Sequence, residues 1–188
     1  MNRSRLAFAL GLLAPALLLG GCSDDPVPKV APASESASAS ESPSPSGSAE
    51  PTMPAVAKGS DAAGARAFVK FWFVAFSYAM RTGDTELVRS LSTPGCVSCH
   101  ALIERVDGIY SKGGSIKSRG WTVEVAAPAR ADEGSAAAFL LRVRQERRTL
   151  YGSDHKVVDS TDMAKVPMRA QLVSAQGSWS LKSLEIVG

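Results

Sequence analysis

The sequence DAAGARAFVKFWFVAFSYAM, residues 61–80, predicts one long helix with a broad apolar face. Its apolar side chains recur at intervals of three and four residues, a spacing that places them on one side of a helix. They are Phe68, Phe71, Trp72, Ala75, Phe76 and Ala79. A face this wide has to be buried, so we expect the helix to form the centre of the core.

Two shorter helices are expected next. Thr82-Gly83-Asp84 supplies a glycine stop and then an Asp that can cap the following helix, whose apolar residues are Leu87, Val88 and Leu91. A break at residues 93–95 precedes a third helix, which begins near Cys96 and ends at Gly113-Gly114. Its apolar face consists of Cys99, Leu102, Ile103, Val106, Ile109 and Tyr110.

After Lys117 the pattern changes to alternation, which predicts strands. Residues 121–125 alternate, and residues 137–150 predict one long half-buried strand. Further strands are expected near 157–158, at 166–173 and at 179–187. The expected fold class is α+β, with three N-terminal helices packed on a curved antiparallel sheet of four to five strands. Such a sheet, wrapped over the first helix, would form a cone with an interior pocket.

Residues 1–21 have the pattern of a lipoprotein signal peptide. Arg3 and Arg5 precede an uncharged apolar run over residues 6–19, and the run ends in Leu19-Gly20-Gly21-Cys22, a bacterial lipobox pattern. We expect Cys22 to carry a diacylglycerol anchor that holds the protein on the outer face of the cell membrane. The alternative is an ordinary secretory signal that leaves Cys22 as a free thiol.

Residues 22–60 differ sharply in composition from the rest of the chain. They are rich in Ser, Ala, Pro and Glu and contain no aromatic residue, so we expect a disordered stalk that ends where a globular domain, residues 61–188, begins. That domain carries 17 basic and 13 acidic residues. The excess is mild and is not interleaved with aromatic residues, so no nucleic-acid partner is expected.

Several segments together carry a family resemblance: residues 68–79, Thr82-Gly83-Asp84-Thr85, Cys96-Val97-Ser98-Cys99, and the step from Tyr110 into Trp121. With these segments the chain resembles a family of unknown function found in lipoproteins of actinobacteria. The order of helices and strands is also similar to nuclear transport factor 2-like cones, which include isomerases, dehydratases and non-catalytic binding domains. The resemblance therefore implies a fold but no activity.

The motif Cys96-Val97-Ser98-Cys99-His100 has several interpretations. We expect a disulfide between Cys96 and Cys99, because lipidation of Cys22 leaves two thiols in an oxidising compartment. The first alternative is covalent c-type haem attached to both cysteines with His100 as an iron ligand, which would make the protein an electron carrier. The second axial ligand would then come from Met80, Met163, Met168 or His155. A redox-active dithiol and a zinc site that adds His155 are further alternatives.

The polar residues expected to face the pocket are Tyr78, Asp107, Tyr110, Gln145 and Arg147. Asp107 with His155 would be the acid/base pair of a pocket enzyme of isomerase or dehydratase type. On the opposite face, Arg142, Arg144 and Arg148 form a basic row that is either solvated or binds an anionic envelope polymer or lipid headgroups. The function hypothesis is a non-catalytic lipoprotein domain without cofactor or metal, which binds a small ligand or a cell-envelope partner.

Overall fold

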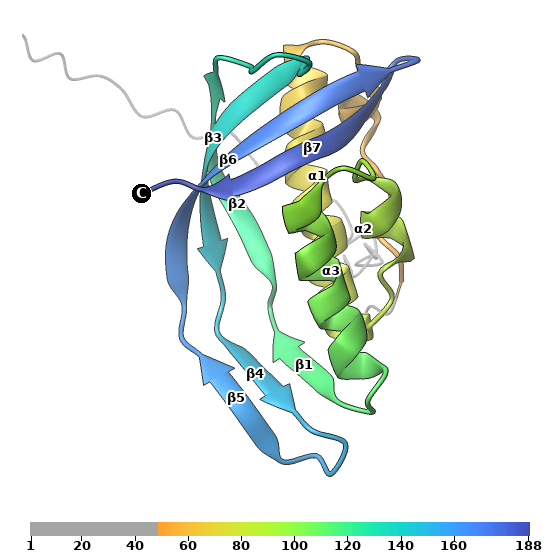
Figure 1. The fold of residues 1–188 in the computed structure, drawn as a ribbon, viewed down its shortest axis with the longest axis vertical. Helices are drawn as coiled ribbons and strands as arrows, with labels where there is room; N and C mark the ends of the chain where they lie inside the picture. The colour runs from red at the N-terminus through yellow and green to blue at the C-terminus, as the bar shows by residue number, and fades with distance from the viewer. Residues whose placement is uncertain (1–48) are drawn as a thin grey trace, which may run out of the picture. The chain divides into compact units, whose positions relative to one another are not determined.

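The computed structural model describes residues 49–188 (Figure 1). The expected signal peptide, Cys22 and most of the expected stalk lie outside the described residues. Within residues 49–188, no helix is both long enough and apolar enough to cross a membrane.

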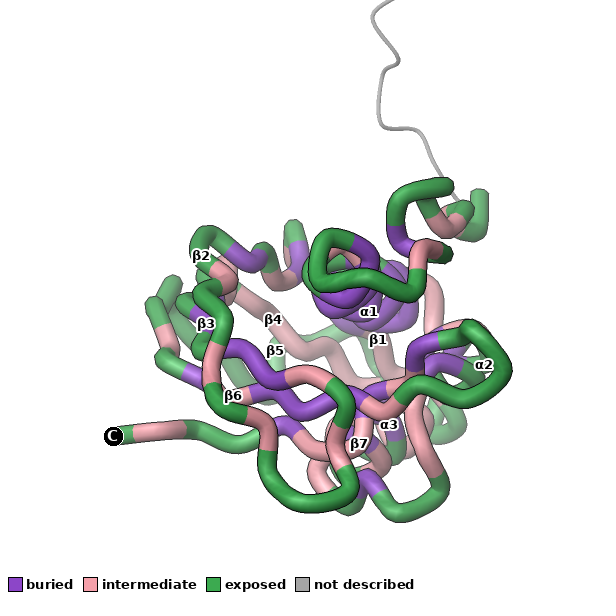
Figure 2. Tube along the Cα trace, turned by 90° about the horizontal axis from the view of Figure 1, so that it is seen from above, coloured by how far each residue is buried: buried purple, intermediate pink, exposed green. Residues whose placement is uncertain are grey.

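Helix α1, Ala62–Thr82, is the central element of the core, as its apolar spacing predicts. The Asp61 carboxylate caps its start by accepting a hydrogen bond from the Gly64 N–H at 2.7 Å. Gly83 ends it in the left-handed conformation, with a φ of 82° that glycine adopts without steric cost. Buried positions gather along α1 and along the strands beneath it (Figure 2).

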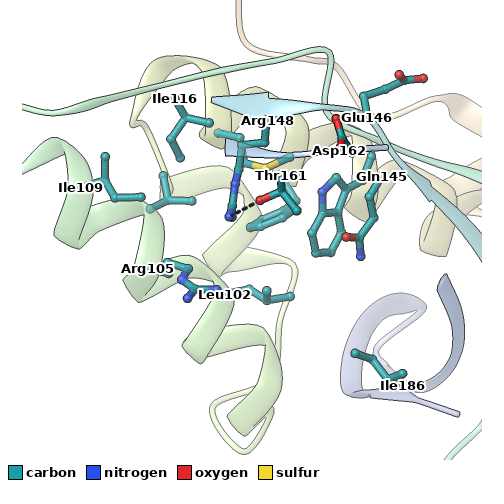
Figure 3. A pocket seen from close by; sticks show the side chains of 14 residues that line it. Leu102, Arg105, Ile109, Ile116, Gln145, Glu146, Arg148, Thr161, Asp162 and Ile186 are labelled. Atoms are coloured by element: carbon teal, nitrogen blue, oxygen red, sulfur yellow. Dashed lines mark hydrogen bonds between the residues drawn. The ribbon is translucent and has the colours of Figure 1, made fainter. Parts of the chain in front are cut away.

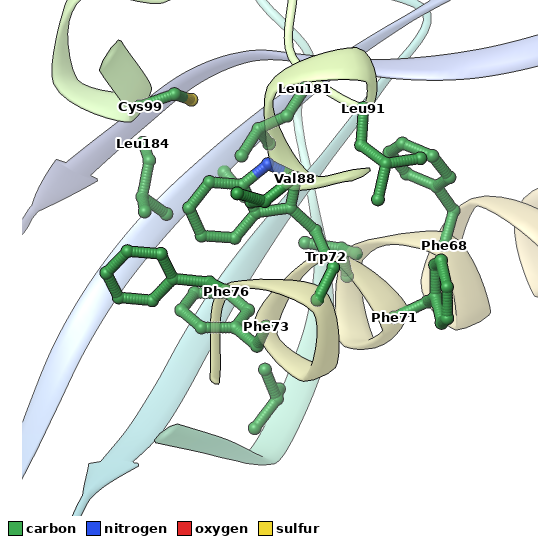
Figure 4. Close-up of a cluster of buried hydrophobic side chains, with 14 of the residues drawn as sticks. Phe68, Phe71, Trp72, Phe73, Phe76, Val88, Leu91, Cys99, Leu181 and Leu184 are labelled. Atoms are coloured by element: carbon green, nitrogen blue, oxygen red, sulfur yellow. The ribbon is translucent and has the colours of Figure 1, made fainter. Parts of the chain in front are cut away.

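The remaining helices pack around α1. They are α2, Glu86–Ser90, and α3, Val97–Tyr110. Figure 4 shows the cluster around Trp72, to which α2 contributes Val88, α3 contributes Cys99 and β7 contributes Leu181 and Leu184. The Trp72 indole is fully buried and donates to Ser92 Oγ at 2.9 Å, so its polar atom is satisfied inside the core.

A short 3-10 helix, η1, Ala55–Lys58, precedes α1 and lies in the segment expected to be stalk. Ala57 is 1% exposed, and the Trp179 indole donates to the Gly59 carbonyl at 2.7 Å. The packed region therefore begins N-terminal to Asp61, the boundary expected from the sequence. The composition of residues 55–60 did not predict this packing, because the only side chain of η1 that is buried is the small Ala57.

Residues 49–188 contain seven strands in two antiparallel sheets, where four to five strands in one sheet were expected. The first sheet has the order β1-β4-β5 and the second has the order β2-β3-β6-β7. The strands are β1 Ser115–Ser118, β2 Trp121–Ala129, β3 Ala137–Gln145, β4 Arg148–Tyr151, β5 Val157–Thr161, β6 Ala164–Ala175 and β7 Ser178–Ile186.

Strands of one sheet continue along the chain into strands of the other. Short interruptions separate them, and these lie side by side. Residues 119–120, 146–147 and 162–163 interrupt the run from β1 to β2, from β3 to β4 and from β5 to β6. On either side the register pairs Trp121 with Gln145 and Ser118 with Arg148. The single strand expected over residues 137–150 is therefore wrong: it breaks at residues 146–147, and the sheet bends there.

Ser77 ties α1 to this bend. Its buried hydroxyl lies 2.7 Å from the Phe73 carbonyl and 3.1 Å from the Trp121 carbonyl, and it accepts from the Trp121 N–H at 2.8 Å. Gly120, with a φ of 94°, lies directly against Ser77, and its carbonyl accepts from the Glu146 N–H at 3.0 Å. A side chain at position 120 would occupy the space of the Ser77 hydroxyl.

Replacing Gly120 by alanine should therefore destabilise the fold. The added Cβ meets Ser77 and the backbone is in a region disfavoured for non-glycine residues, so we expect a loss of about 1–3 kcal/mol in urea denaturation. Gly95→Ala is the matched control, because nothing lies within 4 Å of a Cβ there. Equal stabilities of the two variants would contradict the role of Gly120 in the bend.

Candidate functional site

A pocket of about 290 Å³ lies between α3 and the bent sheets (Figure 3). Its lining is mostly apolar and comes from α1, α3 and the strands on both sides of the bend. The lining residues are Phe76, Met80, Leu102, Arg105, Val106, Ile109, Ile116, Trp121, Gln145, Glu146, Arg148, Thr161, Asp162 and Ile186. The bend creates this space, because the strands turn there under α3.

A second hollow of about 390 Å³ continues the pocket along α3 toward β7. It adds Ser98, Ala101, Met168, Leu184 and Glu185. Both hollows are bordered by the same residues at their junction, namely Leu102, Arg105, Trp121, Gln145 and Ile186. Together they form a continuous groove with Trp121 in its wall.

Trp121 is held in place from two sides. Its backbone N–H and carbonyl contact the Ser77 hydroxyl, and its ring lies edge-on to Phe76 with 5.1 Å between ring centroids. Its side chain is half-buried, so part of it borders the pocket. An aromatic ring that is fixed and partly accessible offers a ready surface for an apolar ligand.

Arg148 reaches the pocket from β4. Its Nη2 donates to Asp159 Oδ2 at 3.1 Å and to Thr161 Oγ1 at 3.0 Å, and its side chain is 20% exposed. Its Nε is buried and has no acceptor among the described residues. The sequence predicts Arg148 on the outer face beside Arg142 and Arg144, and this prediction is wrong. The interruption at residues 146–147 shifts the alternation by one position and turns Arg148 inward.

Gln145 lines the pocket, whereas Arg147 lies on the other side of the sheet. The Arg147 guanidinium pairs with Asp162 at 2.9 Å, and its side chain is 73% exposed. Both residues were predicted to face inward, and the same shift at the bend explains why only Gln145 does so.

Tyr78, Asp107 and Tyr110 do not line this pocket. The Tyr78 hydroxyl donates to Asp84 at 3.3 Å, and burial, reinforced by the Asp84 charge, raises the Tyr78 pKa. The Tyr110 hydroxyl donates to the Met80 carbonyl at 2.9 Å and accepts from the Ile116 N–H at 3.3 Å. Burial raises the pKa of Tyr110, and the bond from Ile116 opposes that rise. Both tyrosines therefore brace α1 against its neighbours.

Asp107 joins α3 to the segment around α2. Its carboxylate accepts from the Thr85 hydroxyl at 2.7 Å and from Arg89 Nη2 at 2.6 Å. Among the described residues, no hydrogen bond or ion pair joins it to His155, which lies in the β4–β5 turn with a φ of 59°. The acid/base pair weighed from the sequence is therefore not assembled here.

Sequence reasoning missed Leu102, Arg105, Ile116 and Trp121 as pocket residues. Leu102, Arg105 and Ile109 lie three and four residues apart on α3, so they share one side of that helix. That spacing could have predicted the site, because it places the Arg105 guanidinium beside the apolar side chains of the same helix face.

A family model described as "Family of unknown function (DUF6318)" matches residues 28–185. The chain belongs to this family. No curated protein matches the DUF6318 chain.

Solved structures resemble this DUF6318 protein in fold. The intermembrane space region of the chloroplast protein ARC6 is 14% identical with a TM-score of 0.50, over 68% of this chain and 97% of that chain. Aln2 from a Streptomyces species is 13% identical with a TM-score of 0.40, over 63% and 85%. An uncharacterized protein with a cystatin-like fold from Caulobacter vibrioides is 13% identical with a TM-score of 0.38, over 64% and 87%. The structural neighbours have nuclear transport factor 2-like and cystatin-like folds.

Cys96 and Cys99 of the DUF6318 protein form a disulfide at the start of α3. The two cysteines are 1% and 0% exposed, and His100 Nε2 lies 3.1 Å from the Thr93 carbonyl. Covalent haem does not fit here, because both thiols are bonded to each other and enclosed. The same burial disfavours a redox-active dithiol, and the described residues contain no group of three His, Cys, Asp or Glu that could hold a metal.

The disulfide also helps to position the pocket. Between the two cysteines, Ser98 Oγ accepts from the Leu184 N–H at 3.2 Å, which joins the start of α3 to β7. Leu102 and Arg105 follow within two turns on the same helix. The beginning of α3 is thus fixed against the sheet, and with it the side chains that delimit the groove.

Exported in a host that matures c-type cytochromes, the Cys22→Ser chain should be colourless. Its two remaining thiols should react with an alkylating agent only after reduction and unfolding, which intact mass would show. Replacing both Cys96 and Cys99 by serine should remove this reaction and lower stability by about 2 kcal/mol, the value expected for a very short loop. A mass gain of one haem, or alkylation without reductant, would contradict the assignment.

Proposed function

We propose that this DUF6318 protein is an actinobacterial lipoprotein, anchored outside the cell membrane, whose domain binds a small ligand without transforming it. The observation that carries the proposal is the apolar groove between α3 and the bent sheets, with the fixed ring of Trp121 in its wall. Its two hollows fall near the lower end of the roughly 300–1,000 Å³ range of ligand pockets.

The polar groups of the groove support binding over catalysis. Glu146 pairs with Arg144 at 2.9 Å and Asp162 pairs with Arg147 at 2.9 Å, both with arginines on the other face of the sheet. Arg148 is paired with Asp159 at 3.1 Å. A general base must be held beside its substrate and free to take a proton: Glu146 is paired with Arg144, and Asp162 is 84% exposed to solvent.

The anchor in this proposal rests on the sequence. Arg3, Arg5, the apolar run over residues 6–19 and Cys22 together have the order of a lipoprotein signal. Lipidation at Cys22 would hold the domain outside the membrane, where a disulfide between Cys96 and Cys99 is stable. The two observations are independent and favour the same compartment.

Leu102→Glu should weaken binding of a neutral apolar probe. N-phenyl-naphthylamine fluoresces when it enters an apolar site, and a carboxylate at position 102 would have to be buried or displace the probe. We expect its affinity for the Cys22→Ser chain to fall roughly tenfold or more. Leu140→Glu on the outer face, where the leucine is 46% exposed, is the matched control and should bind as before. Equal binding by both variants would reject the groove as the site.

Cys22→Ser should abolish lipid attachment. The unsubstituted chain should sediment with membranes and incorporate labelled palmitate, whereas the serine variant should incorporate no label. A melting curve identical to that of the detergent-extracted protein would show that the domain itself is unchanged. Palmitate incorporation by the variant would argue against Cys22 as the lipidated residue.

A further inference from the structure

We infer that the groove takes an amphipathic anion, whose acidic group is bound by Arg105 and whose apolar body packs along Trp121. This inference rests on the proposed function, because it names the ligand class of the same site. It goes beyond apolar binding by assigning a charge to the ligand.

The charges around the pocket leave one cation without a partner. The charged residues that line it are Arg105, Glu146, Arg148 and Asp162. The last three are paired with Arg144, Asp159 and Arg147, at distances between 2.9 and 3.1 Å. Arg105 is exposed and makes no ion pair or side-chain hydrogen bond with any described residue, so its charge is available to a ligand.

The other acidic groups near Arg105 also leave it free. Glu104 precedes it on α3, and Glu185 of β7 lines the adjoining hollow. Both are exposed, and neither forms an ion pair with Arg105. An exposed carboxylate is well solvated and interacts only weakly across water, so it does not neutralise the site.

Arg105 is placed where a ligand that fills the groove would meet it. It borders both hollows, together with Leu102 and Trp121. Figure 3 shows Arg105 reaching from α3 toward the space that Arg148 approaches from β4. The Arg148 Nε is buried and has no acceptor among the described residues, so this end of the pocket has unused hydrogen-bond donors on two walls.

The chemistry of guanidinium favours an oxyanion as the matching group. It is weakly hydrated and presents its N–H donors in a plane that suits a carboxylate, sulfonate or phosphate. The rest of the lining is mostly apolar, through Leu102, Ile116 and Ile186, and would exclude a ligand that is polar throughout. A molecule with one acidic group and an apolar body would match both the guanidinium and this lining.

A pair of probes with the same skeleton tests this. Anilinonaphthalene sulfonate differs from N-phenyl-naphthylamine by one sulfonate, so their affinities for the Cys22→Ser chain isolate the contribution of the anion. We expect the sulfonate to bind roughly threefold to fivefold more tightly, because Arg105 is exposed and water weakens a charge pair there. Rising salt concentration should lower the affinity for the sulfonate probe and leave the affinity for the neutral probe unchanged.

Arg105→Gln should abolish the preference for the sulfonate, measured as the ratio of the two probes' affinities for the same variant. Arg105→Lys should keep part of the preference. Arg66→Gln, which removes an exposed arginine from α1, is the control for net charge and should behave like the parent chain. If Arg105→Gln and Arg66→Gln retain the same preference, the inference fails while the groove stands. If neither probe binds the parent chain, the proposed function fails as well.

Discussion

The Ser77 hydroxyl is the contact on which the site depends, because it holds the central helix against the point where the sheet bends. One oxygen serves the carbonyl of Phe73 on its own helix and the backbone of Trp121 on the first long strand. A straight sheet would pack flat on α1 and α3 and leave no groove. The bend moves the strands away from α3 locally, and the Ser77 hydroxyl fixes the position of Trp121 beside the resulting gap.

The helical half of the fold could be predicted from the sequence. The apolar residues within 68–79 and 99–110 are spaced so that only a helix buries all of them on one side. The sheet was harder. Residues 146–147 are charged, as are Arg144 and Arg148 nearby, so their composition does not distinguish a bend from a strand that continues along an exposed edge. The alternation that places Phe139 and Val143 inward therefore failed beyond Gln145 and put Arg147 and Arg148 on the wrong faces. A shift of one position reverses every side chain after it.

The candidate site was only partly predictable for a related reason. Its residues come from segments at 102–109, 116–121, 145–148 and 161–162, which meet only after the sheet has bent. A sequence pattern reports neighbours on one element, so Gln145 was found and the cation on α3 was not. The motif at Cys96 shows a different limit. Its spacing suits a disulfide, haem or a metal, and only the burial of both sulfurs separates these chemistries.

The hydrogen bond between Gly59 and Trp179 joins parts of the chain that are 120 residues apart. It closes the domain between its first turn and its last strand, and β7 also supplies Leu181 and Leu184 to the cluster around Trp72. A growing chain that stops before Ser178 would lack β7, and with it Leu181, Leu184 and the hydrogen bond from Trp179 to Gly59. The core therefore cannot close until nearly all of residues 49–188 have been synthesised, which makes folding of this domain a late event relative to its synthesis.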